Sequence, residues 1–245
     1  MLKKLFLSAL VIIFAVLSIA FYRTVTHTAS VDGIIAGEVI AFDEQKASQN
    51  LAASIRFKTI SYQDEEMFPY VEFNNFIKWA AATYPEFHQV MEIDQLEHSL
   101  LFKWQGSDSM LAPILFEGHH DVVPIIPGTE NLWQENPFAG VISNNRIWGR
   151  GALDDKSGVI GLMEAATYLI KNNFEPKRTI YFSFGHDEEV GGSGAALITE
   201  KLRQEGVQLS WSLGEGSFVN KGFFPGINKF IAPINVAEKG SANLM

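Results

Sequence analysis

The sequence predicts an α/β fold, a mostly parallel sheet flanked by helices and preceded by an N-terminal hydrophobic helix. Short apolar runs typical of strands alternate with segments in which apolar residues recur at helical spacing. One run, 112–117, is nearly all apolar, as expected of a central strand covered on both faces. His-containing or acidic clusters follow three of the predicted strands, where open α/β sheets bind their ligands.

Residues 1–22 are predicted to be a targeting segment. Two lysines precede an apolar run at 5–22, whose length of about 18 residues is near the minimum for crossing a bilayer. The lysines keep the N-terminus on the cytoplasmic side. A cleaved signal peptide is the alternative, with Ser18 and Ala20 as small residues before the cleavage site. The length of the run favours a retained anchor, and both interpretations put the rest of the chain outside the cytoplasm.

Helices are predicted where apolar residues recur every three or four positions. The predicted ranges are 45–57, 67–84, 157–171 and a helix that follows the glycines at 191–194 and runs to about 203. Pro85 ends the second helix, because the residue before a proline disfavours the α conformation.

Strands are predicted at shorter apolar runs bounded by turn residues. Their ranges are 100–104, 112–117, 146–151 with its turn, 179–184 and 208–213. Residues 124–140 contain several prolines and glycines and are predicted to form a long loop.

Charge and composition exclude some classes of function. Acidic residues outnumber basic ones by 28 to 19, for a formal net charge of −9. A protein that follows nucleic-acid phosphates needs an excess of Lys and Arg, so nucleic acid is not expected as a partner. The chain contains no cysteine, which excludes disulfides, thiolate zinc ligands and cysteine nucleophiles.

The most informative segment is 118–124 (GHHDVVP). Side chains alternate along an extended backbone, so His119 and Asp121 lie on one side and His120 points the other way. An Asp in this position accepts a hydrogen bond from the ring of a metal-bound His and fixes its tautomer. Such a pair by itself is more often structural or exposed, but the carboxylates downstream favour a metal site.

Asp154 and Asp155 precede the predicted helix 157–171. One interpretation is that Asp155 caps the N-terminus of that helix. The preceding segment 149–151 (GRG) indicates a sharp turn that holds one of the carboxylates. The two oxygens of such a carboxylate can bridge two metal ions about 3.5–4 Å apart.

Glu188 and Glu189 are adjacent, so one can bind a metal while the other serves as general base for a water molecule. The glycines at 191–194 let the backbone turn tightly beside them. A solvated acidic turn before a helix is an equally compatible interpretation, because the helix dipole favours Glu at that end.

Four ordered motifs together resemble the M20 family of co-catalytic zinc peptidases. Within that family, the chain is most similar to the branch of carboxypeptidase S and the N-acyl-amino-acid hydrolases. The motifs are 118–124 (GHHDVVP), Trp133 with 137–140 (PFAG), 149–156 (GRGALDDK) and 186–192 (HDEEVGG). The resemblance implies zinc-dependent hydrolysis of amide bonds in small peptides or N-acyl amino acids.

The resemblance also implies a site for two zinc ions. His119 would bind one ion, and Asp121 would orient its ring. Asp154 would bridge both ions, with a cis peptide bond after it. Glu188 would be the general base, which takes a proton from water and returns it to the leaving amine. Glu189 would bind the ion opposite that of His119.

The sequence departs from the family pattern in two places. The branch has an Asp ligand before a Glu-Gly pair, but Gly214 occupies that position here, so Glu215 is the candidate substitute. The family's last zinc-binding His lies beyond a lid domain. Residues 236–240 resemble the entrance to that lid, and the chain ends at Met245. We therefore expect a C-terminally truncated chain whose site is one ligand short.

The expected organisation has four parts. They are a membrane anchor or signal peptide (1–22), a linker (23–44), the N-terminal part of a zinc hydrolase catalytic domain (45–235) and the start of a truncated lid (236–245). The alternative function is a catalytically inactive truncated protein or pseudoenzyme on the same scaffold, which Gly214 favours. The presence of Glu188 and Asp121 favours an enzyme. An unrelated metal-dependent hydrolase, such as a phosphatase, is a further alternative.

Overall fold

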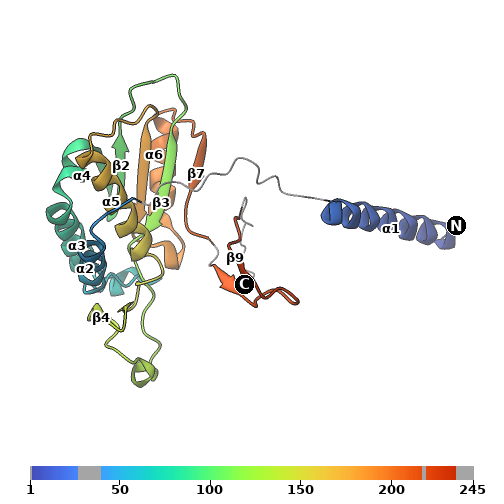
Figure 1. Cartoon of the computed structure of the whole chain (residues 1–245), viewed down its shortest axis with the longest axis horizontal. Coiled ribbons are helices and arrows are strands. Elements are labelled where there is room, and N and C mark those ends of the chain that lie inside the picture. The colour runs from blue at the N-terminus through green and yellow to red at the C-terminus, as the bar shows by residue number, and fades with distance from the viewer. Residues whose placement is uncertain (1, 27–39, 217–218, 236–245) are drawn as a thin grey trace. The chain divides into compact units, whose positions relative to one another are not determined.

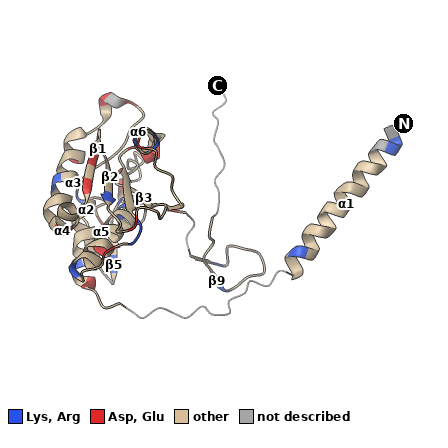
Figure 2. Cartoon of the chain, turned by 90° about the horizontal axis from the view of Figure 1, so that it is seen from above, with Lys and Arg blue, Asp and Glu red and all other residues tan. Residues whose placement is uncertain are grey.

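The structure is a computed structural model that describes residues 2–26, 40–216 and 219–235. The chain divides into two compact units, Met1–Ala41 and Phe42–Met245. The first unit contains the helix α1 (Leu2–Thr26), which continues past the predicted limit at residue 22. Within the described ranges, α1 alone is long and apolar enough to cross a membrane. Figure 2 shows its basic residues near the two ends, with an uncharged stretch between them.

The second unit is built on a five-stranded sheet with the order β1-β2-β6-β3-β7. The strands are β1 (Glu92–Leu96), β2 (Ser99–Trp104), β6 (Ile180–Gly185), β3 (Ile114–His119) and β7 (Trp211–Leu213). β1 and β6 pair antiparallel with β2, whereas β6 and β7 pair parallel with β3. The predicted α/β class is confirmed, and the sheet is mixed. Two parallel neighbours, β3 and β6, lead into the motifs at 118–124 and 186–192.

Helices cover both faces of the sheet (Figure 1). One face packs against α2 (Glu44–Ile55), α3 (Tyr70–Thr83), α4 (Pro85–Val90) and α5 (Lys156–Lys171), and the other against α6 (Ser193–Gln204). Alternation along β2 explains both layers: Leu100 and Phe102 pack toward α3, α4 and α5, whereas Leu101 packs toward α6. β3 alternates in the same way, since Phe116 packs on the first layer and Leu115 on the second, as predicted for the apolar run at 112–117.

Pro85 follows the end of α3, as predicted, and it also begins α4, because its missing N–H is not needed at the first helical position. One local prediction needs correction. The strand β5 (Arg146–Trp148) was expected to belong to the main sheet. Instead it pairs with β4 (Val141–Ser143) in a separate hairpin, through the positive-φ residues Asn144 and Asn145.

The remaining elements are short. They are the 3₁₀ turns Glu65–Met67, Glu130–Leu132 and Glu188–Val190, and the paired strands β8 (Asn220–Lys221) and β9 (Phe230–Ile231). Two parts of the predicted organisation, residues 27–39 of the linker and the lid entrance at 236–245, lie outside the described residues.

Candidate metal centre

His119 is the last residue of β3 and is buried at the carboxyl end of the strand. Its backbone N–H donates to Oδ2 of Asp155 at 3.2 Å, which ties the strand to the start of α5. Gly118 makes this approach possible, because a Cβ atom there would lie 2.8 Å from the same oxygen. The glycine before the motif histidine therefore sets the distance between strand and helix.

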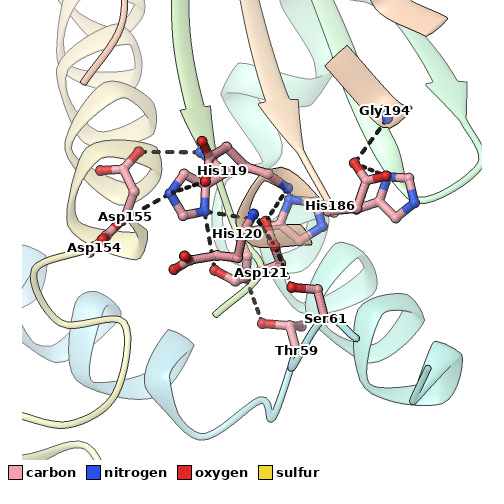
Figure 3. Close-up of polar contacts among 12 residues, drawn as sticks. Thr59, Ser61, His119, His120, Asp121, Asp154, Asp155, His186 and Gly194 are labelled. Carbon is pink, nitrogen blue, oxygen red and sulfur yellow. Dashed lines mark hydrogen bonds and ion pairs between the residues drawn. The ribbon is translucent and has the colours of Figure 1, made fainter. Parts of the chain in front are cut away.

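Asp121 contacts the ring of His119 at its Nδ1 atom (Figure 3). The Nδ1 atom of His119 lies 3.2 Å from the backbone carbonyl oxygen of Asp121 and 3.2 Å from its Oδ1 atom. Burial lowers the pKa of His119, but the charges of Asp121 and Glu215 outweigh it and raise this pKa to about 10. The predicted alignment of the pair is confirmed, and it directs Nε2 of the ring away from Asp121.

His120 points to the opposite side, as the alternation predicted. Its ring stacks on Phe76 with a centroid distance of 4.9 Å and is fully buried. Burial lowers the pKa of His120 to about 3, so the ring is neutral. Its ring nitrogens have no hydrogen-bond partner among the described residues. His120 therefore belongs to the core beneath the site.

Asp154 and Asp155 have separate contacts. Asp155 caps α5 by accepting the N–H of Gly158 at 3.2 Å, which confirms the predicted cap. Asp154 places Oδ1 3.0 Å from Nε2 of His119, and the peptide bond between the two aspartates is cis. Because β5 lies outside the main sheet, Asp154 reaches His119 through the start of α5 and not from a sheet edge.

Glu188 and Glu189 lie on the 3₁₀ turn that follows β6. Their backbone N–H groups donate to Oδ1 and Oδ2 of Asp121, each at 3.2 Å. The Oε2 atom of Glu188 lies 3.9 Å from Nε2 of His119. Burial and the charge of Asp154 raise the pKa of Glu189. The turn after β6 is therefore tied to Asp121, and it places the carboxylate of Glu188 near the ring of His119.

Glu215 follows β7 and reaches the same point. Its Oε1 atom lies 3.6 Å from Nε2 of His119. Burial, followed by the charges of Asp154 and Asp155, raises the pKa of Glu215 to about 7 against the opposing effect of His119. Gly214 leaves the space for a side chain open, since a Cβ atom there would make only ordinary contacts with Glu117.

The side chains of His119, Asp154 and Glu215 fit a metal ion. Each offers one ligand atom, and these atoms all lie within 4.8 Å of one another. One imidazole nitrogen with two carboxylates is a donor set that zinc hydrolases use. Glu189 contributes no atom to this group, although its carboxyl group feels the charge of Asp154. Asp121 and Glu188 border the group, as described above.

Two residues that hold the site were missed by the sequence analysis. Ser61 donates its hydroxyl to Oδ2 of Asp121 at 2.7 Å from the segment after α2. Lys156, the first residue of α5, is fully buried. Lys156 is the last residue of the motif 149–156, but no role was predicted for it or for Ser61, because a serine between two helices and a lysine at a helix start are both common on protein surfaces.

Fold and site together define a class of protein: an α/β protein with a cluster of one His and several carboxylates, able to hold a metal ion, at the carboxyl end of a central strand. Residues 115–235 match the model of peptidase family M20/M25/M40. The chain belongs to this family. The resemblance drawn from the four sequence motifs is confirmed.

Curated relatives lie in the branch that the motifs indicated. The chain is 37% identical over 203 residues to probable carboxypeptidase S-like 2 of Dictyostelium discoideum. It is 39% identical over 198 residues to the N-fatty-acyl-amino acid synthase/hydrolase PM20D1 of Mus musculus. Each alignment covers 80% of this chain and 39% of the relative, so the chain spans less than half the length of these relatives.

A solved structure shares the fold. The M20 family metallo-carboxypeptidase Sso-CP2 from Sulfolobus solfataricus matches with a TM-score of 0.57 at 21% sequence identity. The match covers 72% of this chain and 38% of that chain. At this identity the likeness concerns the arrangement of helices and strands.

Proposed function

We propose that this chain carries the metal centre of a zinc-dependent hydrolase that cleaves amide bonds in peptides or N-acyl amino acids. The observation that carries the proposal is the convergence of Asp154, Glu188 and Glu215 on Nε2 of His119, at 3.0, 3.9 and 3.6 Å. The relatives support the substrate class, since one is named a carboxypeptidase and another an N-fatty-acyl-amino acid synthase/hydrolase.

In this proposal His119, Asp154 and Glu215 would hold one zinc ion, and Asp154 and Glu189 would supply ligands to a second. When bound, zinc polarises the amide carbonyl and lowers the pKa of a water molecule. Asp121 keeps Nε2 of His119 directed toward the ion by binding the ring at Nδ1. The residues that would bind the first ion come from three segments: the end of β3, the turn before α5 and the segment after β7.

Glu188 is the proposed general base. Its side chain is about half exposed, so that substrate and water can reach it. Its backbone N–H is held by Asp121, which keeps the carboxylate beside the metal ligands. Glu188 accepts a proton from water as the oxygen attacks the amide carbon, and later donates that proton to the nitrogen of the leaving amine.

The N-terminal helix α1 is the proposed membrane anchor. Its 21-residue apolar span is comparable with a bilayer core of about 30 Å, because a helix rises about 1.5 Å per residue. Lys3 and Lys4 favour an N-terminus on the cytoplasmic side, with the second unit on the other side of the membrane. A cleaved signal peptide with the same topology is the competing interpretation.

Hydrolysis and zinc content of matched variants test the proposed function. The full chain is purified in mild detergent and assayed against dipeptides and N-acyl amino acids. Glu188→Gln is expected to lower turnover by about 10²-fold or more with unchanged zinc content. Glu117→Gln, at an exposed position of β3, is the matched control and should retain both the turnover and the zinc content of the unaltered chain. Full activity in Glu188→Gln would exclude the proposed mechanism.

A non-catalytic binding protein on the same scaffold is the second candidate. Gly214 supports it, because the related branch has an Asp ligand at that position. The same experiment separates the two functions. Zinc bound by the unaltered chain without turnover of any substrate in the panel would support the binding protein.

A further inference from the structure

Lys156 lies two residues after Asp154, and its side chain has no exposed surface. Its Nζ atom donates to the carbonyl oxygens of Ser54 at 2.9 Å and Phe57 at 2.6 Å. These carbonyls lie in the last turn of α2 and just beyond its end, where the helix dipole favours a cation. The ammonium group therefore connects the start of α5 to the end of α2.

The aliphatic part of the Lys156 side chain packs against the turn that precedes Asp154. A Cβ atom at Gly151 would lie 3.3 Å from Cδ of Lys156 and 2.7 Å from Cγ1 of Val122, so the turn packs directly on both. The ammonium lies 5.5 Å from the ring centroid of Phe76 on α3. One side chain thus contacts α2, α3 and the turn that precedes Asp154.

The start of α5 is held on two sides. Asp155 binds β3 through the N–H of His119, and Lys156 binds α2. Asp154 immediately precedes both residues. Its side chain is 58% exposed and contacts Nε2 of His119 at 3.0 Å, the atom that binds the metal in the proposed function. The backbone that carries this carboxylate is therefore held by the two residues that follow it.

We propose that Lys156 is a positioning residue, which holds the Asp154 carboxylate in metal-binding geometry by fixing the start of α5 against α2. This inference rests on the proposed function, because Asp154 is a metal ligand only there. Loss of the Lys156 hydrogen bonds would let the start of α5 and the turn at Gly151 shift relative to β3. His119 and Glu215 belong to other segments and would stay in place.

The chain offers a matched control at the same helix interface. Asn50 of α2 and the hydroxyl of Tyr84 both donate to Oε1 of Glu164 on α5, at 2.6 and 2.8 Å. Glu164 lies about two turns along α5 from Lys156. The double variant Asn50→Ala/Tyr84→Phe also removes two hydrogen bonds that hold α5, but far from Asp154.

Cobalt binding by the full chain in mild detergent tests the inference, because the visible spectrum of Co²⁺ reports ligand geometry directly. Lys156→Met is expected to weaken cobalt binding by about tenfold or more and to change the spectrum. The double variant should keep the affinity and spectrum of the unaltered chain, even with lower stability. Lys156→Arg, which keeps the charge on a larger head group, is expected to change the spectrum as well. It provides the test if Lys156→Met does not fold.

The outcomes separate this inference from the proposed function. If the unaltered chain binds no cobalt, the proposed metal centre is wrong. If it binds cobalt and the Lys156 variants match the double variant in affinity and spectrum, the positioning role is wrong while the metal centre remains.

Discussion

The Nδ1 atom of His119 lies 3.2 Å from a carboxylate oxygen of Asp121, and both side chains are buried. The same carboxylate accepts the backbone N–H groups of Glu188 and Glu189. Burial opposes ionisation of Asp121, but hydrogen bonds from His119 and Ser61 outweigh it and keep its pKa below the ordinary value. One buried anion therefore aligns the end of β3 with the acidic turn after β6.

Asp121→Asn is expected to lower zinc affinity about 10- to 100-fold, as is typical when the partner of a metal-binding His is changed. The amide carries no negative charge to hold His119, and its NH₂ group cannot accept a backbone N–H. Competition with a chromophoric chelator measures the affinity, with Glu117→Gln as the control. Equal affinities for Asp121→Asn and the unaltered chain would contradict the alignment role.

Gly118→Ala is expected to lower the free energy of unfolding by about 1–3 kcal/mol. The added Cβ atom would lie 2.8 Å from Oδ2 of Asp155 and 3.2 Å from Cγ2 of Val159, both on well-packed parts of α5. Gly161→Ala on the exposed side of α5 is the matched control, because its Cβ atom would meet nothing within 4 Å.

Urea unfolding measures both variants, and Gly161→Ala should raise the free energy of unfolding by about 0.5–1 kcal/mol through its helix propensity. The close approach of β3 and α5 would be disproved by an unchanged stability of Gly118→Ala.

His120 is expected to make the folded state less stable as the pH falls below 6.5. Its pKa is about 3 in the folded state against an ordinary value of 6.5. Between these values the unfolded chain binds a proton that the folded chain excludes, so stability falls with pH by at most about 1.4 kcal/mol per pH unit. His120→Leu removes this contribution.

The quantity to measure is the difference in unfolding free energy between the unaltered chain and His120→Leu from pH 7 to pH 4. Glu215 and His119 change stability with pH in the opposite sense. Their contributions cancel in the difference between the two proteins. The raised pKa of Glu215, about 7, favours the folded state as the pH falls from 7 toward 4.5. The raised pKa of His119, about 10, stabilises the folded state below pH 6.5, and this stabilisation is lost as the pH rises toward 10. A difference that does not vary with pH would show that the buried ring is protonated as readily as in the unfolded chain.

The apolar helix α1 is expected to stay attached and to hold the protein in membranes. Deletion of residues 2–22 should move the protein to the soluble fraction, because it removes most of the bilayer-length span. Mass spectrometry of the membrane-derived protein should find Met1 at or near its N-terminus. A mature N-terminus close to Ala20 would instead establish a cleaved signal peptide.

Much of the site follows from local sequence. Asp155 was identified as a helix cap from its position before an amphipathic segment, because a cap depends only on residues within one helical turn. The alternation of His119, His120 and Asp121 follows from the period of an extended strand. The apolar runs also predicted the central strands, since both faces of such a strand are covered by helices.

The position of Asp154 was predicted for the wrong reason. A strand before it was taken to end at the edge of the main sheet, but that strand pairs locally in a hairpin. Strand pairing is decided by partners across the fold, and a three-residue strand contains too little pattern to select one.

The sequence by itself determined the family, the principal helices and strands of the α/β fold, and the apolar N-terminal helix. Tertiary structure decided that Glu215 faces His119, that Ser61 binds Asp121, and that Lys156 is buried against α2. These contacts join segments between 60 and 102 residues apart. Packing and register bring such segments together, and neither leaves a periodic or local signal at the residues that meet.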